Sequence, residues 1–116
     1  MRRSLTREER LRAGSDITRL FKTARRADVG GLKLLHDSNG TAINRMGVVV
    51  ARGCGGAVRR NREKRITREA YRSLKERVPP GHDLLFFIGK FGSSFDERRS
   101  HMRKLLMRAG FHEHAV

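Results

Sequence analysis

Apolar residues recur at three- and four-residue spacings in three segments of the chain, and this spacing is typical of amphipathic helices. The helices are expected to begin near residues 15, 57 and 95. Their apolar positions are, in order, Ile17, Leu20, Phe21 and Ala24; Ile66, Ala70 and Leu74; and Met102, Leu105, Leu106 and Ala109. A shorter helical turn is expected at 6–12, because its first residues match a capping box.

Strands are predicted at 32–36, 45–52 and 83–88, where β-branched or continuous apolar residues gather. The last of these segments is apolar almost throughout, which is typical of a central strand covered on both faces. An Asn-Gly turn follows the first strand, and 41–44 is expected to extend a hairpin toward the second. A Pro-Pro pair ends the helix before the last strand, because proline cannot continue a helix.

The order of these elements predicts an α+β fold, a compact α-β sandwich in which helices lie against one small mixed sheet. The strand at 45–52, the following helix and the strand at 83–88 form a βαβ unit, whose strands are expected to be parallel if they are neighbours. The general rule makes such a crossover right-handed. The chain is expected to form a single domain, 1–116, with 111–116 as a frayed tail.

The net charge of +15 at pH 7 changes the picture, because so basic a domain is expected to bind nucleic acid or an anionic surface. A membrane is the weaker expectation, since the sequence has no long apolar run and no lipidation signal. The basic N-terminus lacks the apolar region of a secretory signal, and Cys54 is the only cysteine. Together these features predict a protein of a reducing compartment, the cytoplasm.

Cations concentrate on one side of the helix that begins near residue 57. A helix turns by about 100° per residue, which places a polar row opposite the apolar stripe: Asn61, Lys64, Arg65, Arg68 and Arg72. Solvated helix faces usually mix charges of both signs, because like charges four residues apart repel each other. The row of one sign therefore predicts an external polyanion as its partner.

The glycine-rich turn before this helix matches cofactor-binding motifs only in part. Gly53 and Gly55 match the first two glycines of a dinucleotide-binding motif, but Val58 stands where the third belongs, and no P-loop is present. Free N–H groups at the helix start favour an anion, although the glycines can equally serve only to make a tight turn. The carboxylates are spread over different elements, so the chain is expected to hold no catalytic residue and no metal site.

The run 57–72, Ala-Val-Arg-Arg-Asn-Arg-Glu-Lys-Arg-Ile-Thr-Arg-Glu-Ala-Tyr-Arg, closely resembles the "RNR" helix of the bacterial ribonuclease P protein family. The resemblance extends from Leu5 through the strand at 47–52 to 80–83, and thus over nearly the whole chain. It implies that family's α-β sandwich, which is like a domain of a small-subunit ribosomal protein and has a left-handed βαβ crossover. It also implies two RNA partners, a catalytic RNA that binds Mg²⁺ and the precursor tRNA that this RNA cleaves.

The resemblance further implies two RNA-binding surfaces. The helix positions that face the catalytic RNA in this family correspond to Arg60, Asn61, Arg62, Lys64, Arg65 and Arg68. The cleft that holds the single-stranded 5′ leader corresponds to Ile17, Phe21, Leu32, Leu34, Val49, Ala51 and Arg52. The family usually has phenylalanine where Ile17 stands and often a basic residue where Gly53 stands, so this cleft is expected to be less aromatic and less basic than usual.

Phenylalanines give a signal of their own, since single-stranded bases stack on aromatic rings. Phe86 and Phe87 are expected in the core, whereas Phe21 can either pack or stack.

The function that the family resemblance implies is that of a ribonuclease P protein subunit, which assists removal of the tRNA 5′ leader while the RNA subunit carries the catalytic centre. The alternative is a non-catalytic RNA-binding protein of the ribosomal or RNA-chaperone type. A sequence-specific DNA-binding protein fits less well, because no recognition-helix motif is present.

Overall fold

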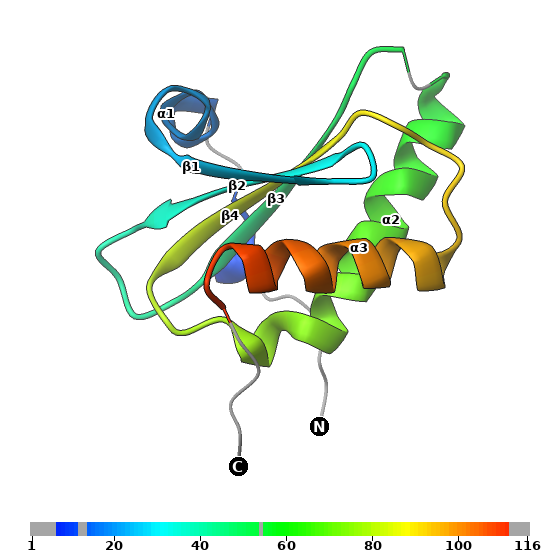
Figure 1. Cartoon of the computed structure of the whole chain (residues 1–116). Helices are drawn as coiled ribbons and strands as arrows, with labels where there is room; N and C mark the ends of the chain where they lie inside the picture. The colour runs from blue at the N-terminus through cyan, green and yellow to red at the C-terminus, as the bar shows by residue number, and fades with distance from the viewer. Residues whose placement is uncertain (1–6, 12–13, 54, 112–116) are drawn as a thin grey trace.

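The computed structural model describes residues 7–11, 14–53 and 55–111, and these form one four-stranded sheet with helices on both of its faces (Figure 1). The strands are β1 (Arg25–Val29), β2 (Leu32–Ser38), β3 (Arg45–Val50) and β4 (His82–Ile88). The α-helices are α1 (Gly14–Thr23), α2 (Ala57–Leu74) and α3 (Phe95–Arg108), and the short 3-10 helices are η1 (Arg7–Glu9) and η2 (Lys75–Arg77). The predicted α+β sandwich is confirmed.

The sheet has the order β1-β2-β4-β3 and is mixed. Strand β4 pairs in parallel with β3 and antiparallel with β2, so β3, α2 and β4 form the predicted βαβ unit. The hand of its crossover, on which the general rule and the family resemblance differ, stays a prediction.

The predicted hairpin through 41–44 is wrong, because β4 lies between β2 and β3. The hairpin in this sheet joins β1 to β2 instead, at Gly30 and Gly31, whose φ angles are +58° and +80°. Positive φ at both central residues suits a tight turn whose twist matches that of the strands. Strand β1 was not predicted, because its sequence Arg-Arg-Ala-Asp-Val offers only two apolar residues to mark it.

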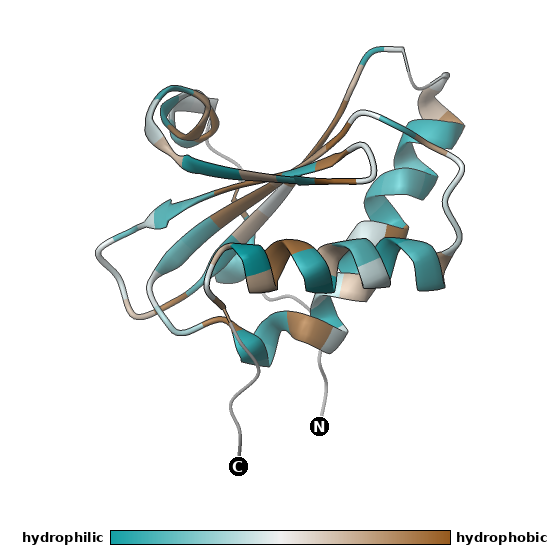
Figure 2. Cartoon of the chain, in the orientation of Figure 1, coloured by the Kyte–Doolittle hydropathy of each residue, from teal (hydrophilic) through white to brown (hydrophobic). Residues whose placement is uncertain are grey.

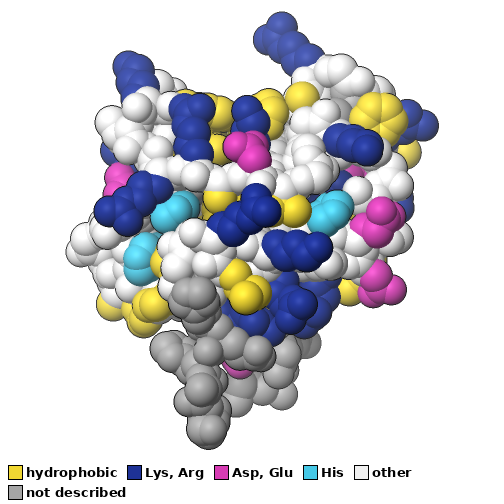
Figure 3. Space-filling model, in the orientation of Figure 1, with side chains coloured by type: hydrophobic (Ala, Val, Ile, Leu, Met, Phe, Trp, Pro, Cys, Tyr) yellow, Lys and Arg dark blue, Asp and Glu magenta, His cyan; other side chains and the backbone are white. Residues whose placement is uncertain are grey.

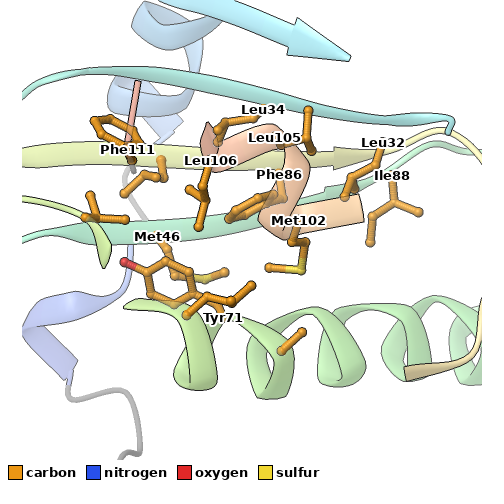
Figure 4. Close-up of a cluster of buried hydrophobic side chains, with 14 residues drawn as sticks. Leu32, Leu34, Met46, Tyr71, Phe86, Ile88, Met102, Leu105, Leu106 and Phe111 are labelled. Atoms are coloured by element: carbon orange, nitrogen blue, oxygen red, sulfur yellow. The ribbon is translucent and has the colours of Figure 1, made fainter. Parts of the chain in front are cut away.

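The main core lies between the sheet and the pair α2 and α3 (Figure 4). Alternate residues of the central strands point into it: Leu32 and Leu34 from β2, and Leu84, Phe86 and Ile88 from β4. Helix α3 contributes Met102, Leu105 and Leu106, and α2 contributes Ala70, Tyr71 and Leu74. Figure 2 shows the same division in colour, with brown concentrated in the central strands and teal along most of α2.

Helix α3 begins as the sequence predicts. The Ser94 hydroxyl accepts a hydrogen bond from the Glu97 N–H at 3.1 Å, and the Glu97 carboxylate accepts one from the Ser94 N–H at 3.1 Å, so the predicted capping box is confirmed. The other expected capping box includes Thr6, which lies outside the described residues. None of the helices in the described part of the chain combines the length and apolar character needed to cross a membrane.

The prediction that residues from 111 onward form a frayed tail is wrong for Phe111. This residue is 7% exposed and belongs to the main core. Its N–H donates to the Leu106 carbonyl at 2.8 Å, which turns the chain back against the sheet after α3. A single aromatic residue beyond the helix stop was enough to anchor this segment, and the helical pattern could not reveal it. Residues 112–116 lie outside the described part of the chain.

The opposite face of the sheet carries α1 and a much smaller apolar cluster, with Leu11, Leu20, Leu35 and Leu85 buried. The segment before α1 lies close to β3, because the Leu11 N–H donates to the Met46 carbonyl at 2.8 Å. A Cβ added at Gly47 would stand 3.0 Å from the Leu11 carbonyl oxygen, so glycine permits this approach. The segment around Leu11 therefore covers the beginning of β3.

A buried carboxylate connects α1 to this face of the sheet. Asp83 on β4 is fully buried and accepts hydrogen bonds from Arg19 of α1 at 2.7 Å and from Arg45 of β3 at 2.7 and 2.8 Å. Burial alone would raise the pKa of Asp83, but hydrogen bonds from Arg45 and Asn39 and the charges of both arginines outweigh it and lower that pKa. Helix α1 is therefore held to the sheet by a charged network as well as by apolar contacts.

Candidate nucleic-acid interface

Helix α2 has one buried apolar side and one polar side, as its sequence predicts. The predicted apolar stripe of Ile66, Ala70 and Leu74 is buried. Asn61 and Arg65 are exposed, while Arg60, Lys64 and Arg68 are half-buried. These members of the polar row therefore lie outside the core and are accessible from solvent, whereas the Nε of Arg72, at the end of the row, is buried without a hydrogen-bond partner in the described part of the chain.

Four of the six predicted RNA-facing side chains on α2 are unpaired within the described part of the protein. No hydrogen bond or ion pair joins the side chains of these four to other described residues: Arg60, Asn61, Lys64 and Arg65. Three of them are cations, and no carboxylate of the described residues forms an ion pair with them. The helix thus presents positive charge and an amide to whatever binds there.

A groove runs between this row and the outer strand β3. It is a hollow of about 300 Å³ lined by Val48, Val49, Val50, Ala57, Arg60, Asn61 and Lys64. Strand β3 is at the end of the sheet, so its backbone faces this groove without a further strand beside Val48–Val50. The groove therefore combines charged side chains with a strand edge, which can bind both phosphates and polar groups of a nucleic acid.

Glu63 is buried in the same helix and was missed by the sequence analysis. Its carboxylate is fully buried and accepts a hydrogen bond from Arg98 of α3 at 2.5 Å. Arg98, itself 2% exposed at its side chain, also donates to the Thr67 hydroxyl at 2.8 Å. The second Glu63 oxygen accepts from the Gly92 N–H at 3.3 Å. A buried ion pair with further hydrogen bonds therefore fixes α2 against α3 and the loop after β4.

This network also determines where Arg62 lies. Its guanidinium donates to the Glu63 carboxylate at 3.1 Å and to the Ser93 carbonyl at 3.5 Å. Of the predicted RNA-facing residues, Arg62 is therefore turned toward its own protein in this structure. Its side chain is still 45% exposed, so one side of the guanidinium remains open to a ligand.

The N-terminus of α2 carries no side-chain cap and no acidic residue in its first turn. Gly55 has φ +88°, and a Cβ there would stand 2.9 Å from the Arg59 side chain, so the tight turn itself requires glycine. The Arg59 guanidinium stacks over the Phe91 ring at 4.6 Å from its centroid. Cys54 lies outside the described residues. The glycine turn therefore has a structural role, and the bare helix start also suits an anion.

The α1 face brings a second set of predicted residues together. Phe21 on α1 is 37% exposed and meets Phe87 of β4 edge to face, with ring centroids 6.0 Å apart. Ile17 and Val49 are partly buried in the same cluster. Ala51 is half-buried and Arg52 is exposed just beyond β3. An aromatic pair thus lies between α1 and the sheet with part of its surface open to solvent.

Leu32 and Leu34 do not lie on this face, so their assignment to the leader cleft is wrong. They are 2% and 0% exposed and point into the main core under α2 and α3. Side chains alternate along a strand, so the residue between them, Lys33, points to the α1 side. Lys33 is exposed and pairs in register with Phe87. The cleft face of β2 therefore offers a cation where two apolar residues were predicted.

Phe87, which was expected in the core, meets that expectation only in part, because it packs against the smaller apolar cluster on the α1 face. It is only partly buried, and it belongs to the α1 face while Phe86 belongs to the main core. Strand alternation within the Phe-Phe pair was the signal that could have separated the two. The partly exposed ring of Phe87 compensates in part for the missing aromatic at Ile17.

Carboxylates in the described part of the chain do not assemble into a metal site, because no three His, Cys, Asp or Glu side chains there converge on one point. The two fully buried carboxylates are engaged by arginines, Asp83 by Arg19 and Arg45, and Glu63 by Arg98. These contacts leave neither group available as a general base. The arrangement is suited to binding a polyanion through cations and aromatic rings.

Comparison with known proteins agrees with this arrangement. The family model described as Ribonuclease P matches residues 5–110. A "Ribonuclease P protein component" from Roseiflexus castenholzii is 36% identical over 115 residues, which cover 97% of this chain and 94% of the relative. The protein of that name from Thermotoga maritima is 39% identical over 98 residues and 84% of each chain.

Solved structures show the same similarity in three dimensions. The RNase P protein of Thermotoga maritima superposes with a TM-score of 0.77 at 33% identity, over 86% of this chain and 96% of that one. The RNase P protein of Staphylococcus aureus also reaches a TM-score of 0.77, over 97% of both chains at 19% identity, which supports the shared fold alone.

Proposed function

This chain belongs to the ribonuclease P protein family and is a protein component of that tRNA-processing enzyme, and from this premise we propose how its surfaces take part. The RNA subunit of ribonuclease P carries the catalytic centre, and the protein binds both that RNA and the precursor tRNA. The protein raises the affinity for the substrate, and it supplies no nucleophile. An RNA partner of this kind is consistent with a cytoplasmic location.

The polar row of α2 is the surface proposed to bind the RNA subunit. The observation that carries this assignment is the set of unpaired side chains Arg60, Asn61, Lys64 and Arg65 beside the open edge of β3. Phosphate contacts from such cations supply most of the sequence-independent affinity for RNA. Arg68 extends the row by one turn, and Arg62 adds its exposed side. Arg62 has to share its guanidinium with Glu63.

The α1 face is the surface proposed to hold the single-stranded 5′ leader. Phe21 and Phe87 offer rings on which bases can stack, and Ile17 and Val49 form the apolar floor beside them. Lys33 lies on β2 and Arg52 follows β3, so the two residues are on either side of the central strand β4. Both are exposed and therefore suited to phosphate contacts. Ala51 is small and leaves room for the strand to pass along β3.

Magnesium ions are proposed to act with the RNA subunit and the substrate. The buried carboxylates of the described chain are neutralised by arginines, so the protein contributes positive charge that helps gather the RNA segments. Closer approach of RNA phosphates creates sites for divalent cations within the RNA, so the protein would lower the magnesium concentration that cleavage requires.

Reconstitution with a bacterial ribonuclease P RNA tests this function. At low magnesium, adding the protein is expected to stimulate cleavage of precursor tRNA at its mature 5′ end. A variant in which Lys64 and Arg65 are both alanine is expected to stay folded, because both side chains lie outside the core, and to stimulate cleavage less than the wild-type protein. No stimulation by the folded wild-type protein would contradict the proposal and favour a general RNA-binding protein of the ribosomal or chaperone type.

A further inference from the structure

A hollow at the end of α3 lies on the side of the sheet away from α1, and the proposed function leaves it without a role. It has a volume of about 190 Å³ and is lined by Arg25, His36, Asp37, Ser38, His82, Ala109 and Phe111. A single water needs only about 10–15 Å³, so the hollow has space for a polyatomic ligand. Figure 3 shows the face that carries α3, where histidines lie among lysine and arginine side chains.

His36 is the least expected residue in this hollow. It is 7% exposed, and neither of its ring nitrogens has a hydrogen-bond partner among the described residues. Its ring packs against Phe111 with centroids 5.3 Å apart. Its ring nitrogens are not among the fully enclosed polar atoms that lack a partner, so they are accessible from the hollow, where a ligand can form the hydrogen bonds that the protein does not supply.

His82 faces the same hollow from β4. Its Nδ1 is 2.8 Å from the Pro79 carbonyl oxygen, and since a carbonyl only accepts, Nδ1 carries a proton. A second proton would therefore add at Nε2 and make the ring a cation. The ring of His82 also packs against Phe111, with centroids 4.9 Å apart, so one aromatic side chain holds both histidines in place.

The charges around His36 favour an anion. Burial lowers the pKa of His36, the charges of Arg25 and His82 lower it further, and only Asp37 raises it. The Asp37 carboxylate is engaged elsewhere, by the Ser38 N–H at 2.8 Å and by Arg19 of α1 at 3.4 Å. Arg25 on β1, which pairs in register with His36, completes a group of three potential cations. A bound anion would relieve the repulsion among them.

A metal ion fits this hollow less well. Two imidazoles could hold zinc, but a structural site needs four ligands and a catalytic one needs three. No group of three His, Cys, Asp or Glu in the described part of the chain could hold a metal, and the Arg25 cation would repel one.

We propose that the hollow bounded by Arg25, His36 and His82 binds a phosphate group. The guanidinium supplies a planar pair of donors, and the imidazoles supply N–H donors from two further directions. The phosphate comes either from an RNA strand or from a small phosphate in solution, and both present the same oxygens. If it belongs to RNA, the protein has a third RNA contact on the face opposite the leader cleft, and that source alone rests on the proposed function.

Imidazole NMR on the full-length protein tests the site directly, with sulfate as the probe because its charge is constant between pH 6 and 8. Sulfate is expected to shift the His36 and His82 signals and to bind more tightly as the pH falls, by about tenfold per pH unit if one proton is taken up. Arg25→Gln, at an exposed position, should weaken this binding without unfolding the protein, and His36→Gln should remove its pH dependence. His101→Gln on α3 is the control and should change neither.

Three results would overturn the proposal: His36 signals that do not respond to sulfate, equal effects of Arg25→Gln and His101→Gln, or a response to zinc alone.

The source of the bound phosphate is identified by measuring the affinity of the protein for the ribonuclease P RNA at pH 6 and pH 8. Loss of about one unit of salt slope in Arg25→Gln supports an RNA phosphate. Unchanged RNA affinity with intact sulfate binding supports a small phosphate. Failure of the reconstitution assay would leave the sulfate result standing, so the two proposals fail separately.

Discussion

The two faces of the sheet differ in how completely they are covered. Among the described residues, the face under α2 and α3 buries an apolar cluster of fourteen residues, whereas the apolar cluster of the α1 face has four, so stability is concentrated on the first face. On the α1 face, part of the aromatic surface stays open at Phe21 and Phe87. The difference suggests that one side of the sheet holds the fold together while the other is left available for a ligand.

The α1 face makes up for its small core with charge. The Asp83 carboxylate forms ion pairs with Arg19 of α1 and Arg45 of β3. These contacts hold α1 in position at one end of the sheet. Such an arrangement fixes the position of α1 without closing the space between Phe21 and the strands. A helix held by a larger apolar contact would have covered the same strands.

Replacing adjacent phenylalanines of β4 should show the difference between the faces most strongly. Phe86→Ala removes a fully buried ring from the main core and is expected to cost about 3–5 kcal/mol of unfolding free energy. Phe87→Ala removes a half-buried ring from the α1 face and should cost only about 1–2 kcal/mol. Denaturant unfolding at one fixed salt and phosphate concentration measures both. Equal losses would contradict the division of roles between the faces.

Asp83→Asn should have the next largest effect. The amide loses the charge-assisted hydrogen bonds to Arg19 and Arg45. This loss is expected to lower the unfolding free energy by about 1.5–3 kcal/mol. Because the folded pKa of Asp83 is lowered, its contribution is present above the unfolded value of about 3.9 and is lost as the pH falls through the folded value. The stability difference between wild type and Asp83→Asn should therefore shrink in acid.

That pH dependence is measured by denaturant unfolding of both proteins between pH 3 and pH 7. Asp28→Asn is the matched control, since Asp28 is exposed and its side chain has no partner in the described residues. A difference that stayed constant over the whole range would mean that the ionised carboxylate of Asp83 does not stabilise the position of α1.

Arg65→Ala should have the smallest effect on stability and act on RNA binding instead. Loss of one phosphate contact is expected to reduce the salt slope of RNA-subunit binding by about one unit. Arg103→Ala is the control, because Arg103 is an exposed cation of α3 that lies outside the α2 groove. The slope follows from binding measured at several salt concentrations. An unchanged slope in Arg65→Ala would remove this residue from the interface.

The sequence predicted the elements whose pattern is long and regular. The apolar stripe of α2, the strand at 83–88 and the capping box at Ser94 all appear where the residues indicate. Strand alternation was not applied to β2 and β4; this error placed Leu32 and Leu34 on the wrong face and left Phe87 undistinguished from Phe86.

Other features depend on contacts between distant segments, which a local pattern does not contain. Glu63 resembles one more charge of a polar helix until Arg98, 35 residues later, meets it in the interior. Phe111 looks like part of a loose end until the hairpin of β1 and β2 places His36 against its ring. Strand β1 itself has too few apolar residues to be predicted, and it forms because β2 supplies its partner.

The most direct test of the account compares the affinity of the reconstituted enzyme for precursor tRNA with and without its 5′ leader. In Phe21→Ala, the leader-containing substrate should bind more weakly by about 1–3 kcal/mol, the value of one lost stacking contact, while the leaderless tRNA binds as before. In Arg65→Ala, the two substrates should change by the same factor. An equal loss for both substrates in Phe21→Ala would show that the α1 face supports the fold only and does not hold the leader.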